Sequence, residues 1–315
     1  MPTIRCITLL TLLALPAAAQ TPPPRMGHVM TTAGRAGGVF LIGGQPPGAA
    51  RSWPDTLWHW SGREWHIVSA AGPRLLTLPA AAFDERRGVL VYQGGHDLVA
   101  RATQGATWEW NGRTWTERGN GGPGVRDHHA MAYDAARGVV VVFGGAPGTA
   151  SFPNDTWTWD GTAWRMADST TGPGGLVHHA MAYDKRRRRV VMYGGFVPDR
   201  PRSSDVWEWD GSRWHRITAD SAGPGIRTHH RMAYDEDRGV VVLYGGFGAP
   251  VGETWTWDGR RWTRASTDGP SRNMQAMAWD AARRRIVMFG GGREGEHGAL
   301  NDLWEWDGTR WEQRH

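Results

Sequence analysis

The sequence predicts an all-β fold: a β-propeller of six blades, each made of four antiparallel strands. Two observations predict it. A tryptophan motif occurs six times, and a Gly-Gly pair occurs six times in phase with that motif. Self-similarity at a fixed period is the signature of repeat architectures, and a spacing near 50 residues fits one four-stranded blade. Six such repeats form a single closed domain, although 315 residues would otherwise suggest two.

The tryptophan motif marks the outer half of each repeat. It consists of a Trp-x-Trp pair and a third Trp that follows after a short turn, and 18 of the 20 tryptophans lie in this register. Alternation at period 2 indicates a strand, and side chains of this size favour an interior position. In the third repeat the motif consists of Trp157, Trp159 and Trp164.

The third repeat contains all four predicted strands in order. Residues 128–134 are expected to form the first strand, and residues 139–143 are an apolar run that suits a second strand covered on both faces. The third strand includes residues 157–159. Asp160-Gly161 then predicts a tight hairpin to a fourth strand at residues 164–167.

The Gly-Gly pair closes the second strand of each repeat, as Gly144 and Gly145 do in the third. Without Cβ atoms, these residues let a neighbouring backbone or ring lie close against the strand. The distances between successive pairs are 51, 50, 50, 51 and 45 residues. The pairs begin at Gly43, Gly94, Gly144, Gly194, Gly245 and Gly290.

The tryptophan motif and the Gly-Gly pair together divide residues 20–315 into six blades. Both terminal blades contain all four strands in order, so we expect no exchange of strands at the ring closure. Blade six is expected to meet blade one by side-chain packing alone. The predicted blades span about 25–70, 71–118, 119–168, 169–218, 219–265 and 266–315.

Residues 1–19 have the pattern of a cleavable signal peptide. A positive start is followed by an apolar segment at 7–15 and by three alanines before Gln20. That segment is shorter than the roughly 20 residues that a membrane span requires. The sequence therefore predicts a secreted or periplasmic protein without a membrane span. Cys6 would be lost with the leader, which leaves no thiol in the mature chain.

The charge of the chain is modest. The net charge is +5, and it falls to +4 without Arg5. We therefore expect no nucleic-acid partner. Because the mature chain has no thiol, a cysteine metal ligand and a thiol nucleophile are excluded. We also expect no metal, no cofactor and a monomer.

Two further sequence patterns recur at the start of the first strands. An arginine stands at the first position in four repeats, and a histidine or glutamine follows three positions later in five. A second histidine precedes three of these. The resulting candidate binding residues at the channel mouth are Arg25, His28, Arg126, His128, His129, His178, His179, Arg227, His229, His230, Arg272 and Gln275.

These motifs together resemble the Kelch family of β-propellers. The likeness rests on Gly-Gly after an apolar strand, on Arg-x-x-His at the first strand and on the paired aromatics before a hairpin. It covers residues 25–315, and the repeats resemble the Kelch variants of exported bacterial proteins, with Met-Ala-Tyr-Asp in the first strand and Trp-x-Trp-Asp-Gly in the third. The resemblance implies that ligands bind on the face around the central channel. A sialidase-type propeller fits less well, because the Gly-Gly pair is foreign to it.

Three interpretations of the histidines stay open. The first is structural: a histidine at the start of an inner strand can bond to the backbone of a neighbouring blade. The second is a ligand site for an anion or a carbohydrate, with the arginines as bidentate donors. The third is a metal at the channel axis. Ligating histidines usually have a carboxylate partner, and only Asp127 offers one in this stretch.

The connections between second and third strands are long and share a face with the inter-blade linkers. Long loops on a rigid scaffold are the usual place for binding. We therefore expect a non-catalytic exported module that binds a glycan or a protein partner through this long-loop face. The alternative is a metal-free sugar isomerase or mutarotase that uses the arginines and histidines of the mouth. Galactose oxidase is a Kelch-like precedent, but its cofactor requires a cysteine. A purely structural role in the envelope is the third possibility.

Overall fold

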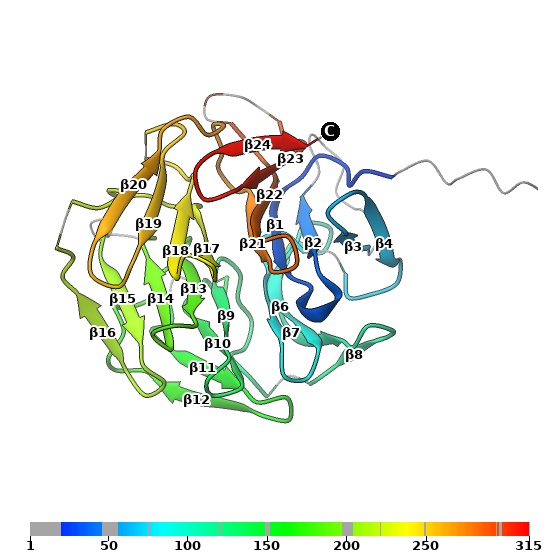
Figure 1. The fold of residues 1–315 in the computed structure, drawn as a ribbon. Helices are drawn as coiled ribbons and strands as arrows, with labels where there is room; N and C mark the ends of the chain where they lie inside the picture. The colour runs from blue at the N-terminus through cyan, green and yellow to red at the C-terminus, as the bar shows by residue number, and fades with distance from the viewer. Residues whose placement is uncertain are drawn as a thin grey trace, which may run out of the picture.

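The structure, a computed structural model, describes residues 20–314 except for 46–55, 75, 120, 149–151, 197–203, 221, 249, 294 and 296–297. These residues form 24 strands in six four-stranded antiparallel sheets, arranged around one axis (Figure 1). The predicted signal peptide lies outside the described residues. None of the described helical segments has the length and apolar character of a membrane span.

Each of the first three blades is built from four strands that follow one another in the chain. Blade one comprises β1 (Met26–Thr32), β2 (Val39–Gln45), β3 (Leu57–Trp60) and β4 (Trp65–Ser69), with a 3₁₀ turn, η1 (Gly34–Ala36), after β1. Blade two comprises β5 (Ala80–Asp84), β6 (Val89–Asp97), β7 (Ala102–Trp110) and β8 (Trp115–Glu117). Blade three comprises β9 (Ala130–Asp134), β10 (Val139–Phe143), β11 (Thr156–Trp159) and β12 (Trp164–Asp168).

The last three blades repeat the pattern. Blade four comprises β13 (Ala180–Asp184), β14 (Arg189–Tyr193), β15 (Val206–Trp209) and β16 (Trp214–Ile217). Blade five comprises β17 (Arg231–Asp235), β18 (Val240–Tyr244), β19 (Thr254–Trp257) and β20 (Trp262–Ser266). Blade six comprises β21 (Ala276–Asp280), β22 (Arg285–Gly291), β23 (Leu300–Trp306) and β24 (Trp311–Arg314). The predicted fold is thus confirmed, and no sheet of the described chain borrows a strand from another blade.

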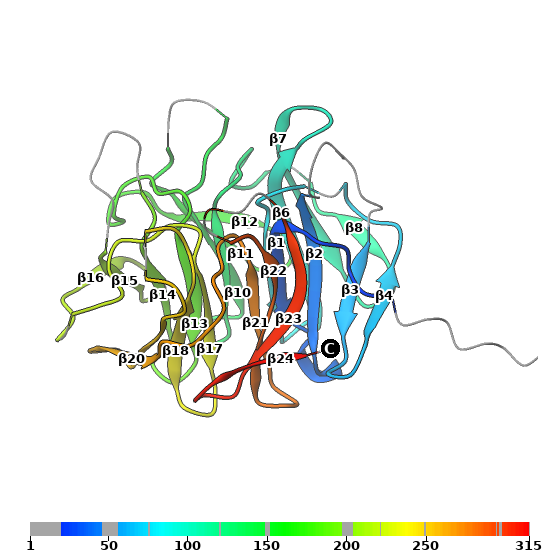
Figure 2. The ribbon, with the colours of Figure 1, turned by 90° about the horizontal axis from the view of Figure 1, so that it is seen from above.

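The first strand of each blade lies innermost and lines the central channel. Each of these strands contacts its counterpart in the next blade, and β21 contacts β1 to close the ring. In the side view the hairpin of β6 and β7 projects on the face of the long loops (Figure 2). The stretch after His96, which the sequence predicts as a loop, is therefore largely paired strand.

The hydrophobic core is divided into one cluster per blade junction. In blade three, Val140 and Val142 pack toward blade two, whereas Val141 and Phe143 pack toward blade four. The apolar run at 139–143 is therefore covered on both faces, as predicted. Trp159 is 2% exposed, and its ring centroid lies 5.4 Å from that of Trp164.

The Gly-Gly pair lies where neighbouring blades come closest. Gly144 and Gly145 have φ values of +65° and +98°. A Cβ on Gly144 would lie 2.5 Å from the Leu176 carbonyl oxygen of blade four. The Gly145 N–H donates to that same oxygen at 2.8 Å. The pair therefore provides both close approach and a hydrogen bond between blades.

The same hydrogen bond occurs at every junction, including the one that closes the ring. There, the Gly291 N–H donates to the Arg25 carbonyl, and the Arg25 N–H donates to the Leu300 carbonyl at 3.0 Å. The expectation that blade six meets blade one by side-chain packing alone is therefore wrong. The six equivalent donors are Gly44, Gly95, Gly145, Gly195, Gly246 and Gly291.

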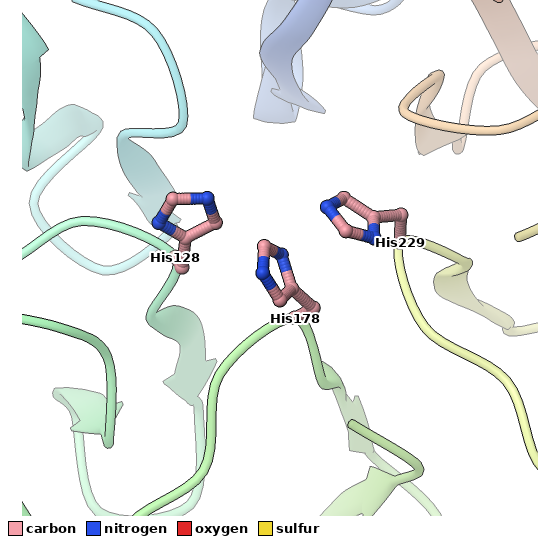
Figure 3. Close-up of side chains that lie close together, drawn as sticks. All are labelled: His128, His178 and His229. Atoms are coloured by element: carbon pink, nitrogen blue, oxygen red, sulfur yellow. The ribbon is translucent and has the colours of Figure 1, made fainter. Parts of the chain in front are cut away.

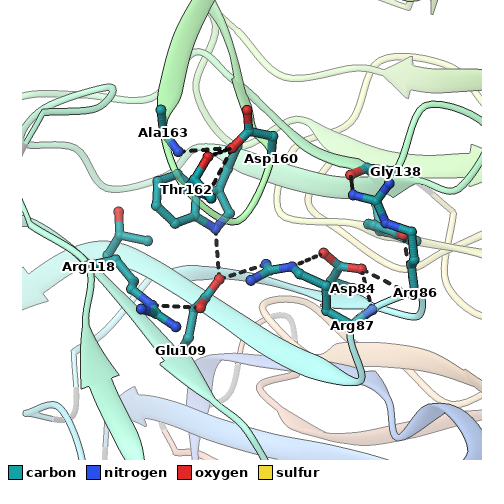
Figure 4. A network of polar contacts seen from close by, with 12 residues as sticks. Asp84, Arg86, Arg87, Glu109, Arg118, Gly138, Asp160, Thr162 and Ala163 are labelled. Atoms are coloured by element: carbon teal, nitrogen blue, oxygen red, sulfur yellow. Dashed lines mark hydrogen bonds and ion pairs between the residues drawn. The ribbon is translucent and has the colours of Figure 1, made fainter.

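Polar networks join neighbouring blades on the face of the short hairpins. Arg87 pairs with Asp84 at 2.6 Å and with Glu109 at 2.6 Å, all within blade two. Glu109 also accepts a hydrogen bond from the Trp159 indole of blade three at 2.8 Å (Figure 4). Arg118 contributes a third donor to this carboxylate.

This network recurs in every second blade. The same arrangement joins Arg187 and Glu208 to Trp257, and Arg283 and Glu305 to Trp60. The middle residue of Trp-x-Trp is accordingly glutamate in blades two, four and six, and histidine or threonine in the others. The ring therefore alternates between blades that hold the carboxylate and blades that donate an indole to it.

Candidate functional site at the channel mouth

One residue per blade, at the start of the innermost strand, contributes to a closed ring of backbone hydrogen bonds. Each N–H donates to the carbonyl of the counterpart in a neighbouring blade, at N···O distances of 2.7–3.2 Å. All six have φ between +53° and +65°, a region that residues other than glycine rarely occupy. We call this set the hub ring. It consists of Gly27, Leu78, His128, His178, His229 and Met274.

Three consecutive blades place a histidine side chain in the hub ring (Figure 3). The ring centroids of His178 and His229 lie 3.7 Å apart, and those of His128 and His178 lie 4.1 Å apart. One nitrogen from each of the three lies within 4.8 Å of the other two. Burial, together with the neighbouring His229 and His128, lowers the pKa of His178 below its usual value. This imidazole is therefore neutral at physiological pH.

Polar and aromatic side chains surround the three imidazoles. His128 Nδ1 lies 2.5 Å from Asp127 Oδ1, and the other oxygen of that carboxylate accepts from the Thr103 hydroxyl at 3.1 Å. The ring of Phe196 stacks on His178 at a centroid distance of 5.2 Å, and Phe247 meets His229 edge-on at 5.2 Å. The Asp127 carboxyl group thus fixes the orientation of one imidazole, and the phenyl rings make part of the rim apolar.

A cavity of about 100 Å³ lies beneath the histidines. Arg231 lines it, at a register position where four other blades have alanine. Its Nη1 donates to the His230 carbonyl at 3.0 Å, and it has no carboxylate partner among the described residues. Burial lowers its pKa to about 10, so the guanidinium stays charged at neutral pH. Methionines from five blades line the channel further down.

The opposite end of the channel is occupied by an ion-pair cluster. Lys185 of blade four lies 2.9 Å from a Glu85 carboxylate oxygen and 2.6 Å from a Glu236 carboxylate oxygen. These three residues come from three different blades and line the same end of the channel. The two mouths therefore differ: one has imidazoles beside a single buried cation, and the other has mutually paired charges.

The other histidine register lies between the blades, and two of its members, His129 and His179, also border the channel cavity. His28 Nε2 lies 3.1 Å from the Phe289 carbonyl oxygen of blade six, and the Gln275 amide donates to the Tyr244 carbonyl at 2.9 Å. His129, His179 and His230 are also buried and face the equivalent carbonyls, in a poorer alignment. Burial lowers the pKa of His179 to about 3 and those of the other three histidines well below the usual value.

The arginine register is also inside the blades. Arg126 donates to the Gly144 carbonyl at 2.9 Å and pairs with Asp155 at 3.0 Å. Arg272 pairs with Asp302. Arg25 and Arg227 likewise donate to the Gly43 and Gly245 carbonyls of their own blades. All four are at most 4% exposed. The guanidinium groups of Arg25, Arg126 and Arg227 therefore hold the end of the second strand in place.

Of the twelve residues that the sequence proposes for the mouth, the structure brings His128, His178 and His229 together at the axis. Sequence reasoning missed Arg231, Phe196 and Phe247 as members of the site. A signal existed for Arg231, which interrupts a register of small residues. No comparable signal marks the two phenylalanines, because each simply follows a Gly-Gly pair.

Comparison with known proteins adds no family to this picture. The chain matches no protein-family model and no curated protein.

Proposed function

We propose that this chain is an exported Kelch-type propeller that binds a glycan over the channel mouth on its long-loop face. The observation that supports this most directly is the composition of the mouth. Three imidazoles are grouped there beside two phenyl rings, whereas the other end of the channel is filled by paired charges.

The chemistry of the mouth suits a polyhydroxylated ligand. A neutral imidazole offers one N–H donor and one nitrogen acceptor, so the group can both donate to and accept from hydroxyls. Phe196 and Phe247 provide apolar faces beside these polar groups. The cavity of about 100 Å³ holds only about three waters at roughly 30 Å³ each. A sugar therefore lies over the mouth and does not enter the channel.

A large protein partner fits this face less well. The exposed large apolar residues on its described part are Val99, Val125, Ile226 and Val251, and each comes from a different connection. Apolar residues scattered singly are ordinary on protein surfaces. A specific protein interface usually buries more than about 1,000 Å² around aromatic or arginine anchors.

The proposal is tested by glycan-array screening of the mature protein, followed by calorimetry on a glycan that binds. We expect His178→Asn and Phe196→Ala each to weaken binding at least tenfold. His66→Asn, on the outer strand β4, should leave binding unchanged, because this side chain is exposed and distant in the blade from the channel. Binding that survives both substitutions at the mouth would place the ligand elsewhere.

One observation favours a catalytic alternative. Asp127 orients His128 at 2.5 Å beside the buried guanidinium of Arg231, and an imidazole held by a carboxylate is a common general base. A sugar isomerase or mutarotase would use such a pair. NMR observation of anomer exchange in reducing sugars, with wild type and Asp127→Asn, separates this activity from binding alone.

A further inference from the structure

We propose that His128, His178 and His229 form a binding site for one divalent transition-metal ion at the axis of the propeller, with zinc as the preferred ion. The proposal does not depend on the glycan function. It differs from the sequence-based expectation of no metal, because the sequence could not show that these three side chains converge.

The first argument is geometric. One nitrogen of each imidazole lies within 4.8 Å of the other two. In a tetrahedral site with Zn–N bonds of about 2.0–2.1 Å, ligand nitrogens are about 3.3 Å apart. The difference amounts to modest rotations of three side chains. The rings converge on one point from three separate blades (Figure 3).

The second argument is that the outer partners of two ligands are already in place. His128 Nδ1 faces Asp127 Oδ1 at 2.5 Å, and His229 Nδ1 faces the Thr228 hydroxyl at 3.2 Å. We infer that both residues would ligate the ion through Nε2. Metal-ligating histidines typically use their second nitrogen in this way, to fix the tautomer and the orientation of the ring.

The third argument is the scaffold. All three residues belong to the hub ring, where their N–H and carbonyl groups are bonded to other members. Their Cα positions are therefore fixed by the closed propeller. Three protein ligands leave a fourth position for water or another small ligand, which is the arrangement of open zinc sites. Imidazole ligands suit zinc, copper and nickel better than magnesium or calcium.

Two charged groups near the ligands act on an ion in opposite directions. The Asp127 carboxyl group contacts the His128 ring and so favours the binding of a cation by that ring. Arg231 lies in the cavity beneath the histidines, and its positive charge opposes the ion. An ion at this site is therefore expected to bind more tightly when Arg231 is removed and more weakly when Asp127 is neutralised.

The experiment uses the mature protein after treatment with a chelator and removal of the chelator. Zn²⁺ is titrated in competition with a chromophoric chelator, and Co²⁺ is added separately to record its visible absorption. We expect one ion per chain and a Co²⁺ spectrum of tetrahedral intensity. In His178→Asn the affinity should fall by more than the roughly 10–100-fold that loss of an outer partner typically costs. Asparagine is chosen because it tolerates positive φ.

Two variants keep all three ligands and thereby separate coordination from folding. Asp127→Asn should weaken Zn²⁺ binding about tenfold or more, and Arg231→Ala should strengthen it. His66→Asn should match the wild type, and thermal melts in chelator should show that each variant is folded. The proposal is overturned if wild type binds Zn²⁺ no better than His178→Asn, or if Asp127→Asn and Arg231→Ala leave the affinity unchanged or shift it in the same direction. No glycan is present, so this result is independent of the proposed function.

Discussion

At the scale of single residues, buried histidines link the stability of the propeller to pH. His179 is almost fully buried between blades three and four, and burial lowers its pKa to about 3. An unfolded chain protonates histidine near pH 6.5. Between these two values the unfolded state binds a proton that the folded state does not. The contribution of neutral His179 to the free energy of unfolding is therefore fully present above about pH 6.5 and is lost as the pH falls toward 3.

Blade six suggests the substitution that tests this link. It has Gln275 in the same register, and the Gln275 amide donates to the same kind of carbonyl without titrating. For His179→Gln we expect a change of less than about 1.5 kcal/mol in the free energy of unfolding at pH 7. Between pH 7 and pH 5 the variant should lose about 2 kcal/mol less than the wild type. Urea unfolding at both pH values measures the difference.

The matched control is His66→Gln on the exposed strand β4, which should follow the wild type at both pH values. Parallel pH profiles for His179→Gln and the wild type would show that His179 does not resist protonation in the folded state.

How far the site was predictable is clearest at individual residues. The Arg-x-x-His register is visible in the sequence, but a register gives only the position along a strand. The rotamer of Arg126 is decided by the Gly144 carbonyl and by Asp155, which come together only in the folded blade. The left-handed φ of His128 is equally hidden. Gly27 at the corresponding position of blade one was the single sequence hint.

At the scale of the strand, the alternation of Trp-Glu-Trp with Trp-Thr-Trp identifies how blades are joined. Glu109 of β7 is 2% exposed and accepts hydrogen bonds from two arginines and from Trp159. An ionised group in such a position requires all of its donors. The alternation could have been found in the sequence, because the three glutamates are 99 and 97 residues apart. The pattern recurs every two blades, so a search for features that recur in every blade does not find it.

Glu109→Ala is expected to lower the free energy of unfolding by about 3–5 kcal/mol, the usual effect of removing one partner from a buried ion pair. The substitution leaves the Trp159 N–H and part of the Arg87 guanidinium without an acceptor. Urea unfolding at neutral pH measures the loss.

Glu312→Ala on the outer strand β24 is the control. Its carboxylate is 40% exposed and pairs with Arg310, so the expected change is within about 0.5 kcal/mol. Equal effects of the two substitutions would mean that the network of Figure 4 does not join the blades.

At the scale of the whole molecule, the number of blades and their strand order were predictable because they repeat. The Trp register and the Gly-Gly pair recur six times, and the structure has six sheets in its described residues. The closure was not fully predictable. The backbone bonds of Arg25 to blade six join two chain segments that are about 270 residues apart in the sequence, and no local sequence pattern indicates such a contact.

Because each blade is complete in sequence and the closing junction uses the same hydrogen bond as the others, the chain can be opened elsewhere. We expect a circular permutant that starts at residue 172 and joins residue 314 to residue 20 by a flexible Gly/Ser linker to fold. Its melting temperature should lie within about 5 °C of the wild type, which corresponds to about 3 kcal/mol for a chain of this size. Differential scanning calorimetry measures the transition.

A chain that ends at residue 268 provides the comparison, because it lacks blade six and uncovers the apolar clusters at both sides of that blade. It should show no cooperative transition. A permutant that also lacks one would mean that the junction between blades three and four needs covalent continuity.

The backbone bonding within the hub ring has one more consequence. Since its members satisfy the polar main-chain groups of one another, their side chains are not needed to hold the propeller shut. Leucine, methionine, glycine and histidine already occupy equivalent places there. The chemistry displayed at the axis can thus be exchanged, one blade at a time, on a frame that stays the same.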